Sequence, residues 1–88
     1  MKIKESDRDK IINFGAFKYD PEKMANILGL NIEDVSVAMN DENSEFKKLY
    51  NIGADRADYV IDLKLFEMAQ TGDIKALDKL EMRKRMRK

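Results

Sequence analysis

The spacing of apolar side chains along the chain predicts five α-helices and no β-strand. The first helix is expected to begin near Ser6 or Asp7, either of which can cap it, and its apolar side chains at positions 11, 12, 14 and 17 cover more than one face. Gly15 lies inside this helix and is tolerated there if another helix packs closely against it.

Residues 20 to 41 have the pattern of two short helices joined by a tight turn. Asp20 can cap the first of them by accepting a backbone N–H, and Pro21 suits the first helical position because its missing N–H is not needed there. Gly29 can end this helix in the left-handed conformation, and Asn31 can cap the next one. The apolar residues expected to face one another are Met24, Ala25, Leu28, Val35, Ala38 and Met39. The segment predicts a helix-turn-helix.

The second helix of this pair would be the recognition helix of a DNA-binding protein, but the segment that contains it is acidic. Residues 31 to 46 include five acidic side chains and no basic one, so the segment carries a net charge of −5. DNA phosphates repel such a surface, although Glu and Asn can still bind base edges. Groove reading and a pure protein-protein role therefore both stay open. The outward-facing residues, and so the candidate DNA contacts, are Asn31, Glu33, Ser36, Val37 and Asn40.

A long helix is expected from about Glu45 to Gln70, after a polar loop in which Asn43 or Ser44 can act as the cap. Its first half has one apolar stripe that could cover the helix-turn-helix, and Gly53 within that stripe could bend the helix. Its second half is apolar around most of its circumference. Such a helix must be buried on several sides.

The chain is expected to reverse at Thr71-Gly72-Asp73 into a fifth helix, which makes a helical hairpin. One short amphipathic helix cannot cover both apolar faces of residues 59 to 69, so the surplus predicts a subunit interface. Coverage by the first helix within the monomer is the alternative. The candidate interface residues are Tyr59, Val60, Leu63, Phe66, Leu77 and Leu80.

Taken together, these elements predict an all-α fold, in which an N-terminal helix-turn-helix bundle is followed by a long helix and a C-terminal helical hairpin. Two regions are expected. Residues 1–44 would form the helix-turn-helix domain, and residues 45–88 would form a hairpin oligomerisation region with a basic C-terminal tail.

Composition narrows the classes of function. The 88 residues include no cysteine and no histidine, which excludes thiolate metal sites and the usual nucleophile–histidine pairs. The 17 acidic and 17 basic side chains alternate along helical faces in the manner of solvated surface. We therefore expect no enzyme activity, no catalytic residues, no cofactor and no metal. Without a signal peptide or an apolar run of membrane-spanning length, we expect a soluble cytoplasmic protein that does not bind membranes.

The C-terminal tail concentrates positive charge. Six basic side chains against Glu81 give residues 79 to 88 a net charge of +5. Three interpretations stay open: a solvated helix end stabilised by the helix dipole, an arm that binds DNA phosphates, or a partner for the acidic segment of a neighbouring subunit. The candidate DNA-binding residues of this tail are Lys79, Arg83, Lys84, Arg85, Arg87 and Lys88.

The order of these features resembles the small subunits of tailed-bacteriophage terminases. In that family a helix-turn-helix is followed by a block similar to Leu-Tyr/Phe-x-x-Ala-x-x-Gly-Asp-x-x-Ala-x-x-x-Leu-x-x-Arg. Here the helix-turn-helix is followed by an Asn-Asp-Glu-Asn-Ser-Glu-Phe linker, by Tyr50-x-x-Gly53, and by a block that runs from Leu65-Phe66 through Ala69-Gln70-Thr71-Gly72-Asp73-Ile74-Lys75-Ala76 to Leu80 and Arg83.

The resemblance implies a non-enzymatic DNA-recognition component of the viral genome-packaging machinery. Family members bind double-stranded DNA and form homo-oligomeric rings, while a separate terminase large subunit carries the ATPase and nuclease activities. It also implies that the protein is located in the cytoplasm of a bacterial host. Ala25, Gly29 and Val35 would be packing positions of the helix-turn-helix, and the hairpin turn would be formed by Ala69, Gly72, Asp73 and Ala76.

Two other functions stay open from the residues themselves. A small helix-turn-helix transcriptional regulator would use the same motif as a dimer on two half-sites. A protein-protein adaptor that does not bind DNA would use the acidic helix-turn-helix surface to contact its partner. The size of the assembly and the salt dependence of DNA binding distinguish the three.

Overall fold

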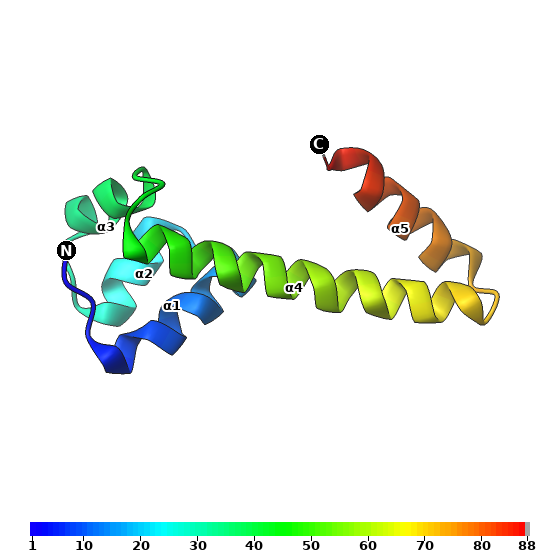
Figure 1. Cartoon of the computed structure of the whole chain (residues 1–88), viewed down its shortest axis with the longest axis horizontal. Coiled ribbons are helices and arrows are strands. Elements are labelled where there is room, and N and C mark those ends of the chain that lie inside the picture. The colour runs from blue at the N-terminus through cyan, green and yellow to red at the C-terminus, as the bar shows by residue number, and fades with distance from the viewer. Residues whose placement is uncertain (88) are drawn as a thin grey trace. The chain divides into compact units, whose positions relative to one another are not determined.

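The computed structural model describes residues 1–87, and the described chain consists of five helices with no strand (Figure 1). The prediction of an all-α fold is confirmed. The helices are α1 (Glu5–Phe17), α2 (Pro21–Leu28), α3 (Ile32–Met39), α4 (Glu45–Gln70) and α5 (Ile74–Met86).

The start of α1 differs from the prediction. Lys4 occupies the N-cap position, and no side chain caps the helix, so the expectation that Ser6 or Asp7 would cap it is wrong. The Lys4 carbonyl accepts a hydrogen bond from the Asp7 backbone N–H at 2.9 Å, which places both predicted caps inside the first turn. Asp7 instead pairs with Lys10 at 3.6 Å, and its charge is favourable near the helix N-terminus.

The helices α2 and α3 are capped by the residues that the sequence predicts. Asp20 accepts from the Lys23 N–H at 2.8 Å, and Asn31 accepts from the Glu33 N–H at 2.7 Å. Gly29 has φ of +70° at the end of α2, a conformation in which a side chain would be strained. The two helices are thus joined by the short turn that a helix-turn-helix requires.

The chain divides into two compact units, residues 1–57 and residues 58–88, and α4 contributes to both. The first unit extends past residue 44 because Phe46 and Leu49 of α4 are buried in its core. Ser44 caps α4, as one of the two predicted caps, and its hydroxyl also donates to the Ala38 carbonyl at 2.6 Å. The buried residues of this core are Ile11, Phe14, Met24, Ala25, Val35, Ala38, Phe46 and Leu49.

In the first unit α1 and α4 pack closely at two glycines. A Cβ atom on Gly15 would lie 1.8 Å from the Tyr50 carbonyl oxygen, and one on Gly53 would lie 1.6 Å from the Ile12 carbonyl oxygen. Any side chain at either position would force the two backbones apart. The condition under which Gly15 is tolerated, close packing against another helix, is met, and α4 remains a continuous helix through Gly53.

The second unit is a helical hairpin. Gly72 has φ of +97° in the turn, and Asp73 caps α5 by accepting from the Ala76 N–H at 3.1 Å, as the sequence predicts. Ala76, at 2% exposure, is the one fully buried side chain among the described residues of this unit. The hairpin therefore lacks a core comparable to that of the first unit.

Candidate DNA-binding and assembly surfaces

The candidate recognition surface lies on α3, whose buried side holds Val35 and Ala38 in the core of the first unit. Val37 is 69% exposed, and Glu33 and Asn40 are also exposed. Ser36 is only half-buried and so partly accessible. These positions share the accessible side of α3, and none of them is basic.

Asn31 is exposed but is already used in the fold. Its side-chain oxygen accepts the Glu33 N–H at the start of α3, which leaves its amide NH₂ group to contact a ligand. Asn31 therefore helps to position α3. Because its side-chain oxygen is already used, it is less able to form the two hydrogen bonds by which a free Asn amide binds a base edge.

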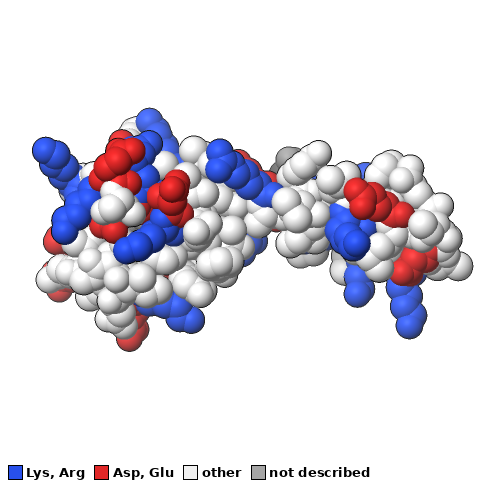
Figure 2. Space-filling model, turned by 90° about the horizontal axis from the view of Figure 1, so that it is seen from below, with Lys and Arg blue, Asp and Glu red and all other residues white. Residues whose placement is uncertain are grey.

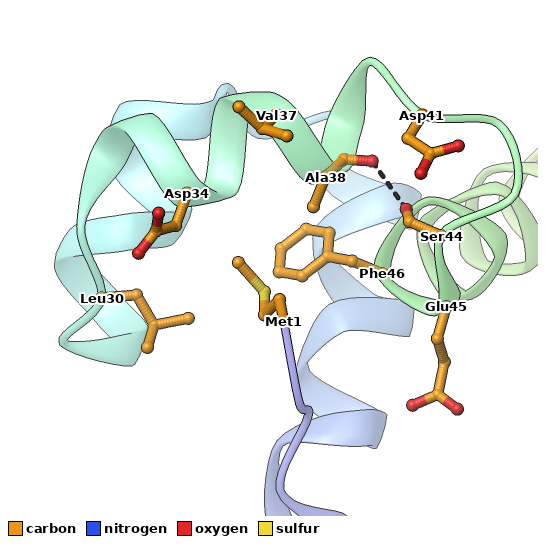
Figure 3. A pocket seen from close by; sticks show the side chains of 9 residues that line it. All are labelled: Met1, Leu30, Asp34, Val37, Ala38, Asp41, Ser44, Glu45 and Phe46. Atoms are coloured by element: carbon orange, nitrogen blue, oxygen red, sulfur yellow. Dashed lines mark hydrogen bonds between the residues drawn. The ribbon is translucent and has the colours of Figure 1, made fainter.

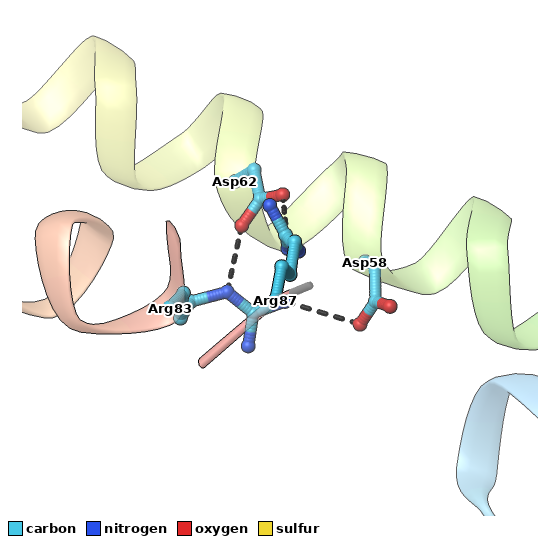
Figure 4. A network of polar contacts seen from close by, with 4 residues as sticks. All are labelled: Asp58, Asp62, Arg83 and Arg87. Carbon is cyan, nitrogen blue, oxygen red and sulfur yellow. Dashed lines mark hydrogen bonds and ion pairs between the residues drawn. The ribbon is translucent and has the colours of Figure 1, made fainter. Parts of the chain in front are cut away.

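The basic tail does not act as one group, because two of its arginines bind carboxylates of α4 (Figure 4). Arg83 donates to Asp62 at 2.7 Å and to Asp58 at 3.1 Å, and Arg87 pairs with Asp62 as well. Asp58 and Asp62 lie one turn apart on α4, Arg83 lies on α5, and Arg87 follows the end of α5 in an extended conformation. We call these four residues the hairpin clamp.

The clamp shifts the pKa of two of its members, Asp62 and Arg83. The hydrogen bond from Arg83 holds the pKa of the Asp62 carboxyl below its ordinary value, and Arg87 adds to the effect. The same hydrogen bond from Arg83 to Asp62 raises the pKa of the Arg83 guanidinium. These charges compensate one another within the hairpin, so Arg83 and Arg87 are poor candidates for binding phosphate.

The other basic residues of the tail are more accessible. Lys84 forms an exposed pair with Glu81 at 3.3 Å, of the weak kind that one helix turn allows. Lys79 and Arg85 are exposed, and no ion pair with either is found within residues 1–87. Lys88 lies outside the described residues.

Charge divides between the two units. Residues 1–57 hold nine basic and eleven acidic side chains, a net charge of −2, and residues 58–88 hold eight basic and six acidic ones, a net charge of +2. On the face of the first unit seen in Figure 2, basic and acidic side chains are interspersed without a broad basic tract. The first unit alone offers duplex DNA little phosphate attraction on that face.

The hairpin exposes apolar side chains on α4. Tyr59 is 65% exposed and Phe66 is 50% exposed. Leu63 lies between them in the sequence and on the same face of α4. Val60 and Leu77 are exposed as well, whereas Leu80 is half-buried beside Ala76 along α5. The predicted interface residues are thus mostly accessible, and α1 packs on the first part of α4 instead.

Sequence reasoning missed the hairpin clamp. Its signal was present in the spacing, because two acids at i and i+4 on α4 can meet two arginines four positions apart at the end of α5 across a hairpin. The net charge of the tail does not reveal the hairpin clamp, because it counts basic side chains that are paired with carboxylates and those that are not in the same way.

Within residues 1–87, no group of three or more potential ligand side chains is arranged to hold a metal ion. No helix in this part of the chain is both long enough and apolar enough to cross a membrane. Comparison with protein-family models, with curated proteins and with solved structures finds no match for this chain.

Proposed function

We propose that this protein is a homo-oligomeric, non-enzymatic DNA-recognition protein of the kind found as the small subunit of phage terminases. The observation that carries the proposal is the pairing of two unlike units: a closed helix-turn-helix unit with an accessible α3, and a hairpin that leaves large apolar side chains uncovered. A module that binds weakly, attached to a module that gathers copies, is the arrangement expected of a multivalent DNA binder.

Oligomerisation is assigned to the hairpin. A unit of about 30 residues, with one buried side chain among those described, gains little from burial on its own, and chains this small usually need a partner. Covering Tyr59, Leu63 and Phe66 against a second copy would supply the missing burial. We expect a closed assembly of several copies, because the resemblance to terminase small subunits implies a ring.

DNA recognition is assigned to α3 together with the cations of α5 that lie outside the hairpin clamp. Glu33 and Asn40 can bind base edges, while Lys84 and Arg85 supply attraction to phosphate that α3 lacks. Each copy alone would bind weakly because its first unit is net negative. Many linked copies bind far more tightly than one. The ATPase and nuclease would belong to a separate large subunit, in the cytoplasm of the bacterial host.

Binding of labelled duplex DNA by the full-length protein tests this assignment. We expect binding at about 50 mM salt that weakens steeply by about 200 mM salt. Arg85→Ala should lower the slope of log affinity against log salt by about one, whereas Lys64→Ala, which removes an exposed cation of α4, should leave it unchanged. The Tyr59→Ser/Phe66→Ser variant should lose both assembly and most of the binding.

The outcomes separate the candidate functions. A dimer that binds two half-sites would favour the transcriptional regulator over the terminase-like assembly. An assembled protein that does not bind duplex DNA even at about 50 mM salt would overturn both DNA-binding proposals. That last result would favour a protein-protein adaptor. The absence of any basic residue from positions 31 to 46 also supports an adaptor.

A further inference from the structure

The first unit contains an apolar groove beside α3 (Figure 3). The groove has a volume of about 550 Å³, and it lies between α3, the loop that follows α3 and the start of α4. Phe46 and Ala38, both buried in the core, line it, and the exposed side chains of Leu30 and Val37 line it as well. Met1 lies beside Phe46 in the groove and remains 58% exposed. The groove thus accepts an unbranched methionine side chain.

Carboxylates surround this apolar floor. Asp34, Asp41 and Glu45 line the groove. Glu45 is paired with Arg8 at 3.0 Å, but within residues 1–87 neither Asp34 nor Asp41 forms an ion pair. The groove therefore suits a ligand that combines flexible apolar side chains with positive charge.

One face of α5 has this chemistry. Lys75, Lys79, Met82 and Met86 follow one another at i, i+4, i+7 and i+11 and so lie on a single stripe. All four are exposed, Met86 at 79%. This stripe differs from the one that packs in the hairpin, which contains the buried Ala76 and the clamp residue Arg83. It also excludes Lys84 and Arg85, to which phosphate binding is assigned.

We propose that the groove of one copy binds the Lys75–Lys79–Met82–Met86 face of α5 of a second copy. Met82 and Met86 contact the exposed side chains of Leu30 and Val37, and the two lysines pair with Asp34 and Asp41. Charge complementarity selects a second copy as the occupant, because the first unit carries −2, the second carries +2, and the chain is neutral. The acidic surface beside α3 is then a docking site in its own right, and this role goes beyond DNA recognition and does not depend on it.

Disulfide trapping tests the contact cleanly, because the native chain has no cysteine. Val37→Cys in one full-length copy and Met86→Cys in another place thiols on the two proposed surfaces, and both native side chains are largely exposed. Lys84→Cys provides the matched control, since it lies on the same turn of α5 as Met86 but faces the other side. The copies carry tags of different size, so that the mixed disulfide is separated by electrophoresis.

We expect the Val37–Met86 disulfide to form about tenfold more than the Val37–Lys84 disulfide, a ratio within reach of a specific contact. Asp34→Lys/Asp41→Lys in the first copy should abolish the preference. Adding Lys75→Glu/Lys79→Glu to the second copy should restore it, because the exchanged charges are again complementary. Circular dichroism of each variant checks that the helix content is retained.

Three results would overturn the proposal. The first is equal trapping at Met86 and Lys84. The second is a charge exchange that fails to restore trapping in variants with native helix content. The third is a disulfide within one chain, seen when a single copy carries both cysteines and the yield does not change on dilution. DNA binding is measured separately with the Arg85→Ala variant, so failure here and failure of the proposed function are distinguishable.

Discussion

The two units of this chain are stabilised by different interactions. The first unit, residues 1–57, buries eight apolar side chains around α1, α2, α3 and the start of α4. The second unit, residues 58–88, has one buried side chain among its described residues and is held by the hairpin clamp. Burial of apolar area is worth far more than partly exposed ion pairs, so the first unit has much more to stabilise it than the second.

That difference agrees with the roles proposed for the two units. A closed unit can present α3 rigidly, while an open hairpin with exposed aromatic side chains is suited to bind another copy. The same helix, α4, is buried in its first part and exposed in its second, so its sequence has to satisfy two different environments. Changes in each part of α4 should therefore affect different properties.

The largest effect is expected from Gly53→Val in the first unit. The added side chain would collide with the Ile12 carbonyl and separate α1 from α4, which should lower the free energy of unfolding by about 3 kcal/mol or more. Chemical denaturation followed by circular dichroism measures the change. Gly72→Ala is the control: its Cβ has open space, and the cost of its positive φ should be about 1 kcal/mol and confined to the hairpin.

The Tyr59→Ser/Phe66→Ser variant should act on assembly instead of on the first unit. Both side chains are exposed in the single chain, so the unfolding of the first unit should be unaffected, while the dissociation constant of the assembly should rise by about tenfold or more. Sedimentation velocity measures the assembly. Ile27→Ser, which removes an exposed apolar side chain of α2, should leave the assembly intact; equal loss in both variants would count against the hairpin interface.

The hairpin clamp should make the second unit sensitive to acid. The pKa of Asp62 is lower in the folded hairpin than in the unfolded chain, so its stabilising effect is fully present above the ordinary value of 3.8 and is lost as pH falls through the lower, folded value. Titration of Asp62 by NMR measures that value directly. Arg83→Ala should raise the pKa of Asp62 toward 3.8, whereas Lys84→Ala, which removes only the exposed ion pair with Glu81, should leave the pKa of Asp62 unchanged.

A small stabilisation is expected from Lys18→Gly. Lys18 ends α1 with φ of +56°, in the left-handed region where a side chain is strained, and it is the one described non-glycine residue with positive φ. Glycine should relieve this strain and raise the free energy of unfolding by about 0.5 kcal/mol. Thermal denaturation detects the change, and a lower melting temperature would show that the Lys18 side chain contributes more than its backbone costs.

The sequence predicts the local structure of this chain well because its signals are short in range. Asp20, Asn31 and Asp73 each cap the helix that follows, and Gly29 and Gly72 adopt the positive φ that their positions suggested. The start of α1 was less predictable, because several polar residues there can serve as caps and the helix begins without one.

The candidate sites were harder to predict because they depend on contacts between distant residues. The sequence shows that the tail is basic, but not that Arg83 and Arg87 are paired with carboxylates about 20 to 30 positions earlier. It shows an acidic segment around α3, but not the groove that Phe46 and Leu30 form beside it. DNA binding, the assembly and its size stay predictions.

The most direct test of the difference between the units is hydrogen exchange measured at several protein concentrations. If the second unit is stabilised by other copies, backbone amides of residues 58 to 87 should exchange slowly in the assembly and quickly after dilution, while amides of α1 and the first part of α4 keep the same protection. Protection of the hairpin that equals that of the first unit and does not change on dilution would contradict the account.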